Sequence, residues 1–209
     1  AEEDYLAREI DVVMTGGPLT LLGKAHKVVG DSIGYSNLLL SDKRDYTLLT
    51  TDGILLKGST LGTRKVAVYS GSFNPFHDGH AEVIKKVIDN YDRIWLELSI
   101  KNVDKPEINL ISLDDRILSI THGLTKHDLH DRVAGIILTN TPKFKDKLWQ
   151  LGPNVDFLVG SDTAKRIVDT KYGDPQELID ISETYGTRFI VVRRPGHEFI
   201  IPKKYDTGV

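Results

Sequence analysis

The chain has 209 residues, of which 40% are hydrophobic and 27% are charged, a composition typical of one folded domain with or without an appendage. Its formal net charge of −3 argues against nucleic-acid binding through bulk positive charge, and the sequence has no run of about 18 apolar residues that would predict a membrane span. The chain contains no cysteine, which excludes disulfides, thiolate zinc sites and a cysteine nucleophile. With an N-terminus that is acidic rather than signal-like, these features predict a cytoplasmic protein.

Residues 1–64 predict a small β-rich N-terminal appendage. Short apolar runs lie on either side of the dipeptide Asp52-Gly53, which is a typical hairpin turn. The residues of this region suggest no particular chemistry, so its role stays open. One alternative is that it is part of a second catalytic domain, of which this sequence holds only the end.

Residues 65–209 predict an α/β domain. Runs of β-branched and aromatic residues predict five strands, over residues 65–71, 93–100, 132–140, 155–162 and 188–196. Amphipathic segments predict helices over residues 80–91 and 143–152 and helices that begin at Ser112, Thr163 and Pro175. Short strands alternating with helices are typical of parallel βαβ units, so we expect a Rossmann-like, doubly wound parallel sheet. Such sheets bind ligands beyond the carboxyl ends of their strands, where the strand order reverses.

The segment GSFNPFHDGH, residues 71–80, follows the first of these strands. Gly71 and Ser72 allow a sharp turn, because glycine tolerates positive φ and lets a ligand approach the backbone. The helix behind the turn points its free N–H groups and positive dipole end toward it, an arrangement that favours phosphate. His77 and His80 are three residues apart and can face the same side. We therefore predict a phosphate-binding loop without a carboxylate, and we disfavour zinc because no further ligands complete a set.

This decapeptide resembles the G-x-F-x-P-x-H-x-G-H signature of the HxGH nucleotidylyltransferases. That superfamily includes nicotinamide mononucleotide adenylyltransferases, pantetheine-phosphate adenylyltransferase and cytidylyltransferases for choline- or glycerol-phosphate. The segments SIKNVDKPEINLISLDDR, FLVGSDTAKRIVD and VVRRPG resemble later parts of the same family, so the resemblance covers about residues 65–200. GSFNP together with VVRRPG is most similar to the nicotinamide or nicotinate mononucleotide adenylyltransferases.

The resemblance implies an enzyme in which an acceptor phosphate oxygen attacks the α-phosphorus of ATP or CTP and pyrophosphate leaves. It implies Mg²⁺ bound with the nucleotide, small-molecule nucleotide substrates, and no nucleic-acid or membrane partner; homo-oligomer formation stays open. The residues it implies as catalytic are His77, His80 and Lys105. Those it implies for binding nucleotide or substrate are Gly71, Ser72, Phe73, Asn74, Gly79, Lys101, Arg116, Gly160 and Asp162.

Several alternatives stay open. A cytidylyltransferase and a pantetheine-phosphate adenylyltransferase would share the same loop. The family's second signature, I-S-S-T-x-x-R, is not found, because SDTAKR lies too early in the chain. Either the sequence continues beyond Val209, or the protein is a nucleotide-binding module without turnover. Among the outer residues, Asp162 could be only a helix N-cap and Arg116 could pair with Asp114 or Asp115. Lys101 and Lys105 could be solvated lysines of a polar loop.

Overall fold

The computed structural model describes residues 10–11, 24–27, 46–50, 54–58, 61, 65–99 and 110–192. Its centre is a parallel sheet of β5 (Val66–Ser70), β6 (Arg93–Ser99), β7 (Gly135–Thr139), β8 (Val155–Gly160) and β9 (Phe189–Val192). The strand order is β7-β6-β5-β8-β9, so the chain moves outward from β5 in one direction and then crosses back to the other side at β8. The prediction of a doubly wound parallel sheet is confirmed.

Four further strands extend this sheet beyond β7. They are β1 (Ile10–Asp11), β2 (Lys24–Lys27), β3 (Tyr46–Thr50) and β4 (Ile54–Gly58), and all their pairings are antiparallel. The strands β3 and β4 pair on either side of the predicted Asp52-Gly53 turn, which lies outside the described residues. Tyr46, Leu48 and Leu61 are at most 2% exposed and belong to the core of the main sheet. The β-rich character of this region is confirmed, while a domain boundary at residue 64 stays a prediction.

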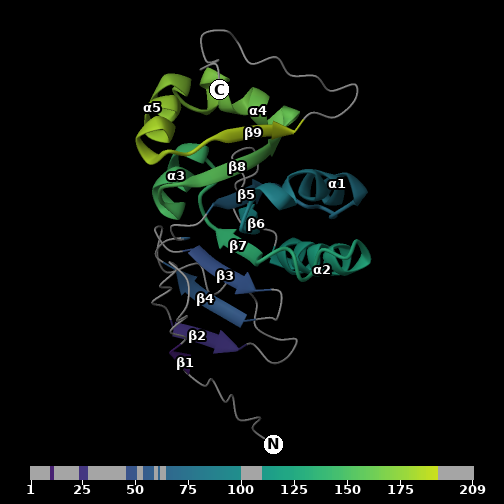
Figure 1. The fold of residues 1–209 in the computed structure, drawn as a ribbon. Coiled ribbons are helices and arrows are strands. Elements are labelled where there is room, and N and C mark those ends of the chain that lie inside the picture. Colours follow the sequence, from purple (N-terminus) through teal and green to yellow (C-terminus); the bar gives the residue numbers. More distant parts are fainter. Residues whose placement is uncertain are drawn as a thin grey trace, which may run out of the picture.

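The helices cover both faces of the parallel sheet (Figure 1). They are α1 (Asp78–Val87), α2 (Leu110–Lys126), α3 (Phe144–Leu151), α4 (Ser161–Ile167) and α5 (Pro175–Tyr185), with short 3-10 helices η2 (Ile88–Asn90) and η3 (Thr170–Tyr172). Buried side chains of α1 and α2 pack on one face, and those of α3, α4 and α5 pack on the other. Among the described residues, no helix combines the length and apolar character needed to cross a bilayer.

Two predicted helix starts are wrong. The helix α2 begins at Leu110, so Ser112 lies within its first turn and does not cap it. The helix α4 begins at Ser161 with Gly160 as its N-cap, so Asp162 is not the cap that was considered for it. In α4 the extended backbone of Gly160 (φ −76°, ψ 164°) ends the strand and caps the helix at once, which leaves no connecting residue for Asp162 to occupy. By contrast, α5 begins as predicted at Pro175, behind the capping carboxylate of Asp174.

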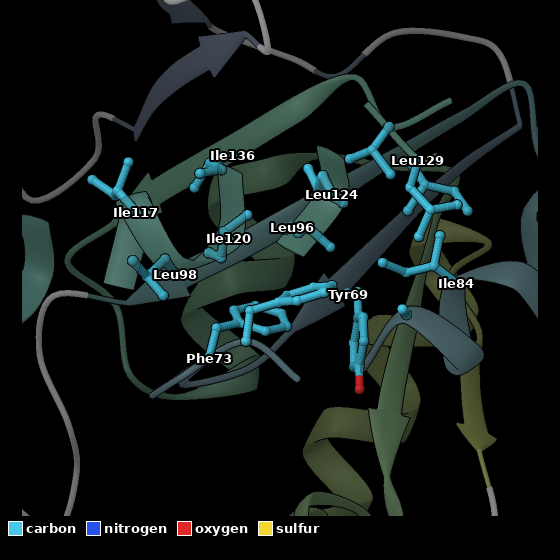
Figure 2. Close-up of a cluster of buried hydrophobic side chains, with 14 of the residues drawn as sticks. Tyr69, Phe73, Ile84, Leu96, Leu98, Ile117, Ile120, Leu124, Leu129 and Ile136 are labelled. Atoms are coloured by element: carbon cyan, nitrogen blue, oxygen red, sulfur yellow. The ribbon is translucent and has the colours of Figure 1, made fainter. Parts of the chain in front are cut away.

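The core beneath α1 and α2 reaches into the segment that follows β5. Figure 2 shows Leu96, Leu98 and Ile136 of the sheet beside side chains of α2, with the ring of Phe73 near that of Tyr69. Each such aliphatic or aromatic side chain contributes about 1.5–3 kcal/mol when fully buried. Because Phe73 is 0% exposed, the loop that precedes α1 is anchored in this core.

Candidate active site

The predicted phosphate-binding loop joins the carboxyl end of β5 to α1. It begins where the strand order reverses between β5 and β8, which is the place where doubly wound sheets bind ligands. The Gly71 N–H donates a hydrogen bond to the Glu97 carbonyl oxygen on the neighbouring strand at 3.2 Å. Ser72 and Asn74 are exposed, whereas Phe73 and Phe76 are buried. The loop therefore alternates between side chains that root it in the core and side chains that face solvent.

Phe73 is the residue of this loop with a strained backbone conformation. Its φ is +43°, a value that bulky residues rarely adopt and that costs on the order of 1–3 kcal/mol. Its buried ring packs edge-on against Tyr69, with the ring centroids 5.3 Å apart. A Cβ on Gly71 would lie 2.9 Å from this ring, so Gly71 is needed to make room for Phe73. Within this loop the positive φ lies at Phe73 rather than at a glycine, and the packing of the Phe73 ring holds it there.

His77 and His80 lie together at the start of α1. His77 is the N-cap, and the two imidazole rings stack with their centroids 3.7 Å apart and an interplanar angle of 27°. The His77 N–H donates to Nδ1 of His80 at 3.1 Å. Because this nitrogen accepts, the proton of a neutral His80 ring is on Nε2, which makes Nε2 the donor nitrogen of the ring. The ring of His80 also contacts Phe73 and Phe76, with centroids 5.0 and 5.4 Å away, so its orientation is fixed from several sides.

Gly79 and Asp78 complete the start of the helix. A Cβ on Gly79 would lie 3.1 Å from the His77 ring, so the glycine lets that ring lie close to the helix backbone. The Asp78 carboxylate turns toward the end of α2, where Lys126 and His127 each lie 2.9 Å from Oδ1. The hydrogen bond from Lys126, followed by that from His127, lowers the pKa of Asp78. The Asp78 carboxylate of the signature thus pairs with residues at the end of α2 and does not face a ligand bound by the loop.

The turn after β8 lies beside this loop in the sheet. Gly160 caps α4, and a Cβ placed on it would meet no atom within 4 Å among the described residues, so the space beside it is open. Asp162 lies in the first turn of α4 with its side chain 82% exposed, at 3.9 Å from Lys165. An open backbone at Gly160 next to the histidine loop is consistent with a nucleotide lying across both strand ends.

Arg116 extends from α2 toward the end of β6. Its Nη2 donates to the Ser99 carbonyl oxygen at 3.3 Å, a different partner from the acidic neighbours considered for it. Burial lowers the pKa of Arg116, and the nearby Glu97 opposes that change. Its Nε is buried without a hydrogen-bond partner in the described part of the chain, so the guanidinium retains donor capacity. Lys101 and Lys105, the other two predicted cations, lie outside the described residues.

A buried polar cluster near the carboxyl ends of the strands was not predicted from the sequence. Glu97 of β6 is 0% exposed, and its Oε2 lies 2.6 Å from Nζ of Lys147 on α3. The Thr139 hydroxyl donates to the other carboxylate oxygen. In the register of the sheet Glu97 pairs with Ser70, the last residue of β5. The one charged residue within the run IWLELS, residues 94–99, was the available signal for this cluster.

Protein ligands for a metal ion do not gather in the part of the chain that the structure describes. No group of three or more histidine, aspartate or glutamate side chains there could hold an ion. The histidines stack on each other, and Asp78 is paired with α2, so this region offers N–H donors rather than a carboxylate cage. Such a donor set suits phosphate oxygens.

Comparison with known proteins places the chain in a family. A sequence model described as "Cytidylyltransferase-like" matches residues 68–208, which is most of the chain. The chain belongs to the cytidylyltransferase-like family. The resemblance to the HxGH nucleotidylyltransferases is thereby confirmed, and the family match includes the whole histidine loop.

Individual relatives of this family member differ in how much they share. A phosphopantetheine adenylyltransferase of Mycoplasma capricolum is 51% identical over 41 residues, which are 20% of this chain and 29% of that protein. The chain therefore spans less than a third of that relative's length. A probable nicotinate-nucleotide adenylyltransferase of Fusobacterium nucleatum is 27% identical over 138 residues, 62% of this chain and 68% of that protein.

Among solved structures, one neighbour supports the fold. It is the nicotinic acid mononucleotide adenylyltransferase of Plasmodium falciparum, complexed with NaAD, with a TM-score of 0.51 and 19% sequence identity. The alignment covers 68% of this chain and 70% of the neighbour. At this identity the similarity establishes that the two chains share a fold.

Proposed function

We propose that this protein is an adenylyltransferase that transfers AMP from ATP to a mononucleotide or phosphate-ester acceptor and releases pyrophosphate. The observation that carries the proposal is the stacked pair of His77 and His80 at the start of α1, where the strand order reverses. Membership of the cytidylyltransferase-like family supports it. A cytoplasmic location and the absence of nucleic-acid and membrane partners remain predictions of the same proposal.

The chemistry requires little covalent help from the protein. An oxygen of the acceptor's phosphate forms a bond to the α-phosphorus, and the bond from that phosphorus to the bridging oxygen of the β-phosphate breaks. Pyrophosphate leaves with the electron pair, so negative charge grows on the leaving group. Alignment of the two substrates and hydrogen bonds aimed at that charge are the main sources of rate enhancement in such reactions.

The histidines are placed for this task. The His77 backbone N–H donates to Nδ1 of His80, so Nε2 is the ring nitrogen that would donate to a phosphate oxygen. The exposed ring of His77 and backbone N–H groups at the start of α1 would contact the same phosphates. We assign His77 and His80 to the α- and β-phosphate oxygens, and the amides of Ser72 and Phe73 to a neighbouring phosphate.

The remaining residues would hold the two substrates. Gly160 and Asp162 lie beside the loop at the next strand end and are assigned to the base or ribose. Arg116, together with Lys101 and Lys105, is assigned to the acceptor phosphate, and Lys105 is also assigned a catalytic role. Mg²⁺ would accompany ATP, held mainly by phosphate oxygens and water, and would neutralise part of the triphosphate charge.

Pyridine mononucleotide is the favoured acceptor. Support comes from GSFNP and VVRRPG in the sequence and from the extent of the match to the probable nicotinate-nucleotide adenylyltransferase, 138 residues. A second acceptor, phosphopantetheine, is favoured by the 51% identity to a phosphopantetheine adenylyltransferase, although that match covers 41 residues.

A pyrophosphate-release assay separates these possibilities. ATP and CTP are each combined with nicotinate mononucleotide, nicotinamide mononucleotide, phosphopantetheine and glycerol phosphate. We expect release with ATP and a pyridine mononucleotide. Release with CTP alone would support a cytidylyltransferase, and calorimetric ATP binding without release from any pair would support a binding module.

The His80→Ala variant tests the role of the loop. Removing one donor to a transition-state charge typically lowers the rate by about 10²–10³, and we expect that loss with a small change in thermal midpoint. His122→Ala is the matched control, because His122 is exposed on α2 and lies outside the loop. A large drop in the thermal midpoint of His80→Ala, with turnover intact, would make His80 a packing residue.

A further inference from the structure

One face of α2 contacts the histidine loop at three successive turns. Phe76 contacts Ser119 and Gly123. Asp78 contacts Lys126, the last residue of the helix, and His127, which follows it. Positions spaced by four and then three or four residues lie on the same side of a helix. The loop is therefore held at its two ends by β5 and α1 and, in addition, by contacts with α2, which is distant in sequence.

The first contact is a hydrogen bond to the backbone. The Phe76 N–H donates to Oγ of Ser119 at 2.8 Å, and the bond is partly buried. Phe76 immediately precedes His77, the residue at which the chain turns into α1. This hydrogen bond therefore fixes the position of the loop backbone relative to α2 immediately before His77.

The second contact is the packing of a ring against a glycine. A Cβ on Gly123 would lie 2.2 Å from Cδ1 of Phe76, so the ring rests directly on the helix backbone. Phe76 is 8% exposed, and its other neighbours are the ring of Phe73 at 6.0 Å and that of His80 at 5.4 Å. Movement of Phe76 would thus be passed directly to His80.

We propose that Ser119 and Gly123 are positioning residues that set the location of His80 through Phe76. This inference rests on the proposed adenylyl transfer, in which His80 contacts a phosphate. Arg116 lies three residues before Ser119 on the same side of α2. One rigid helix would therefore position both Arg116, which is assigned to the acceptor phosphate, and His80, which is assigned to a phosphate of ATP. Alignment of this kind matters because a displacement of about 1 Å can lower a rate about 100-fold.

The first test compares three variants on α2. Ser119→Ala removes the acceptor for the Phe76 N–H, Ser119→Thr retains a hydroxyl, and Thr125→Ala is the control because its hydroxyl bonds to the Thr121 carbonyl of its own helix. We expect kcat of Ser119→Ala to fall about three- to tenfold, as for loss of one hydrogen bond, with KM for ATP nearly unchanged. Ser119→Thr should recover most of that loss. An unchanged kcat in Ser119→Ala, or an equal loss in Thr125→Ala, would overturn the proposal.

A double variant tests whether the effect acts through the histidine. If Ser119 works by placing His80, then Ser119→Ala should cause little further loss of kcat once His80→Ala is present. Multiplicative losses would show that Ser119 acts elsewhere and would overturn the proposal. Gly123→Ala adds a second case, because alanine normally stabilises a helix interior by about 1 kcal/mol over glycine. A lowered kcat supports the contact with Phe76, whereas a higher thermal midpoint with unchanged kcat contradicts it.

A measurement without turnover keeps this inference separate from the proposed function. The imidazole NMR signals of His80 and the hydrogen exchange of the Phe76 amide are compared in wild type, Ser119→Ala and Thr125→Ala. We expect faster exchange and a shifted His80 signal in Ser119→Ala alone. If no substrate pair gives pyrophosphate, the adenylyltransferase assignment fails, yet these signals still decide whether Ser119 positions His80. Identical spectra in all three proteins would overturn the positioning role.

Discussion

Replacing Lys147 by methionine should leave the buried carboxylate of Glu97 without its ion-pair partner. Glu97 is 0% exposed, and the side chain of Lys147 is 7% exposed, with 2.6 Å between Oε2 and Nζ. Methionine retains most of the apolar stem of lysine but removes the ammonium group. The Thr139 hydroxyl would still donate to this buried carboxylate, and the charge of Arg116 would still act on it, but the ammonium group hydrogen-bonded to it would be gone.

The expected loss follows from that geometry. Breaking a buried ion pair by removing one partner costs about 3–5 kcal/mol, whereas an exposed pair contributes about 0–1 kcal/mol. For a protein of this size each kcal/mol moves the thermal midpoint by about 2–4 °C, so the expected fall is about 6–20 °C. The double variant Glu97→Gln, Lys147→Met should recover most of the loss, because it removes the stranded charge and leaves an acceptor for Thr139.

Calorimetry and urea unfolding would measure these differences. Lys145→Met is a matched control, since Lys145 lies on the same helix and pairs with Glu177 while both side chains are more than 40% exposed. We expect a loss of at most about 1 kcal/mol for this control. If Lys147→Met is no less stable than Lys145→Met, or if the double variant is as unstable as Lys147→Met, the buried-charge argument is refuted.

Two further predictions concern the opposite end of the sheet and the site. The Tyr91 hydroxyl donates to Asp156 at 2.9 Å, and burial, followed by that carboxylate, raises the pKa of Tyr91 to about 12. Because the folded-state pKa exceeds the ordinary value of 10.0, the stabilisation is complete below pH 10 and is lost as pH rises toward 12. Urea unfolding at about pH 9 and about pH 11.5 should show a smaller decline for Tyr91→Phe than for wild type, and equal declines would contradict this. Gly160→Ala should leave the thermal midpoint nearly unchanged, because its Cβ meets no described atom within 4 Å and its φ of −76° suits alanine. Calorimetry should then show weaker ATP binding, and an unchanged Kd would remove Gly160 from the nucleotide site.

Local patterns were sufficient to predict the parallel sheet and the histidine loop. The strands β5 to β9 lie within the predicted ranges, because buried parallel strands are continuous runs of β-branched and aromatic residues. The start of α5 was also predictable, since proline and its preceding aspartate favour a helix start directly. The stacked histidines follow from their spacing at a helix start, which is a local property.

Contacts between distant segments could not be predicted in the same way. Phe76 and Ser119 are 43 residues apart, and Glu97 and Lys147 are 50 apart. No periodicity relates such pairs, because they meet through the packing of α2 and α3 on opposite faces of the sheet. The positive φ of Phe73 is also a tertiary effect, since an isolated phenylalanine avoids that region.

The antiparallel strand β3 gives the parallel sheet a closed side at β7. Leu48 and Leu49 of β3 pair with Ile137 and Ile136, so the run GIILT of β7 has hydrogen-bonded neighbours on both sides. An unpaired apolar strand is a template for aggregation and for pairing with another chain. A shortened protein that begins at residue 65 would expose that edge, and its solubility would then depend on what replaces β3.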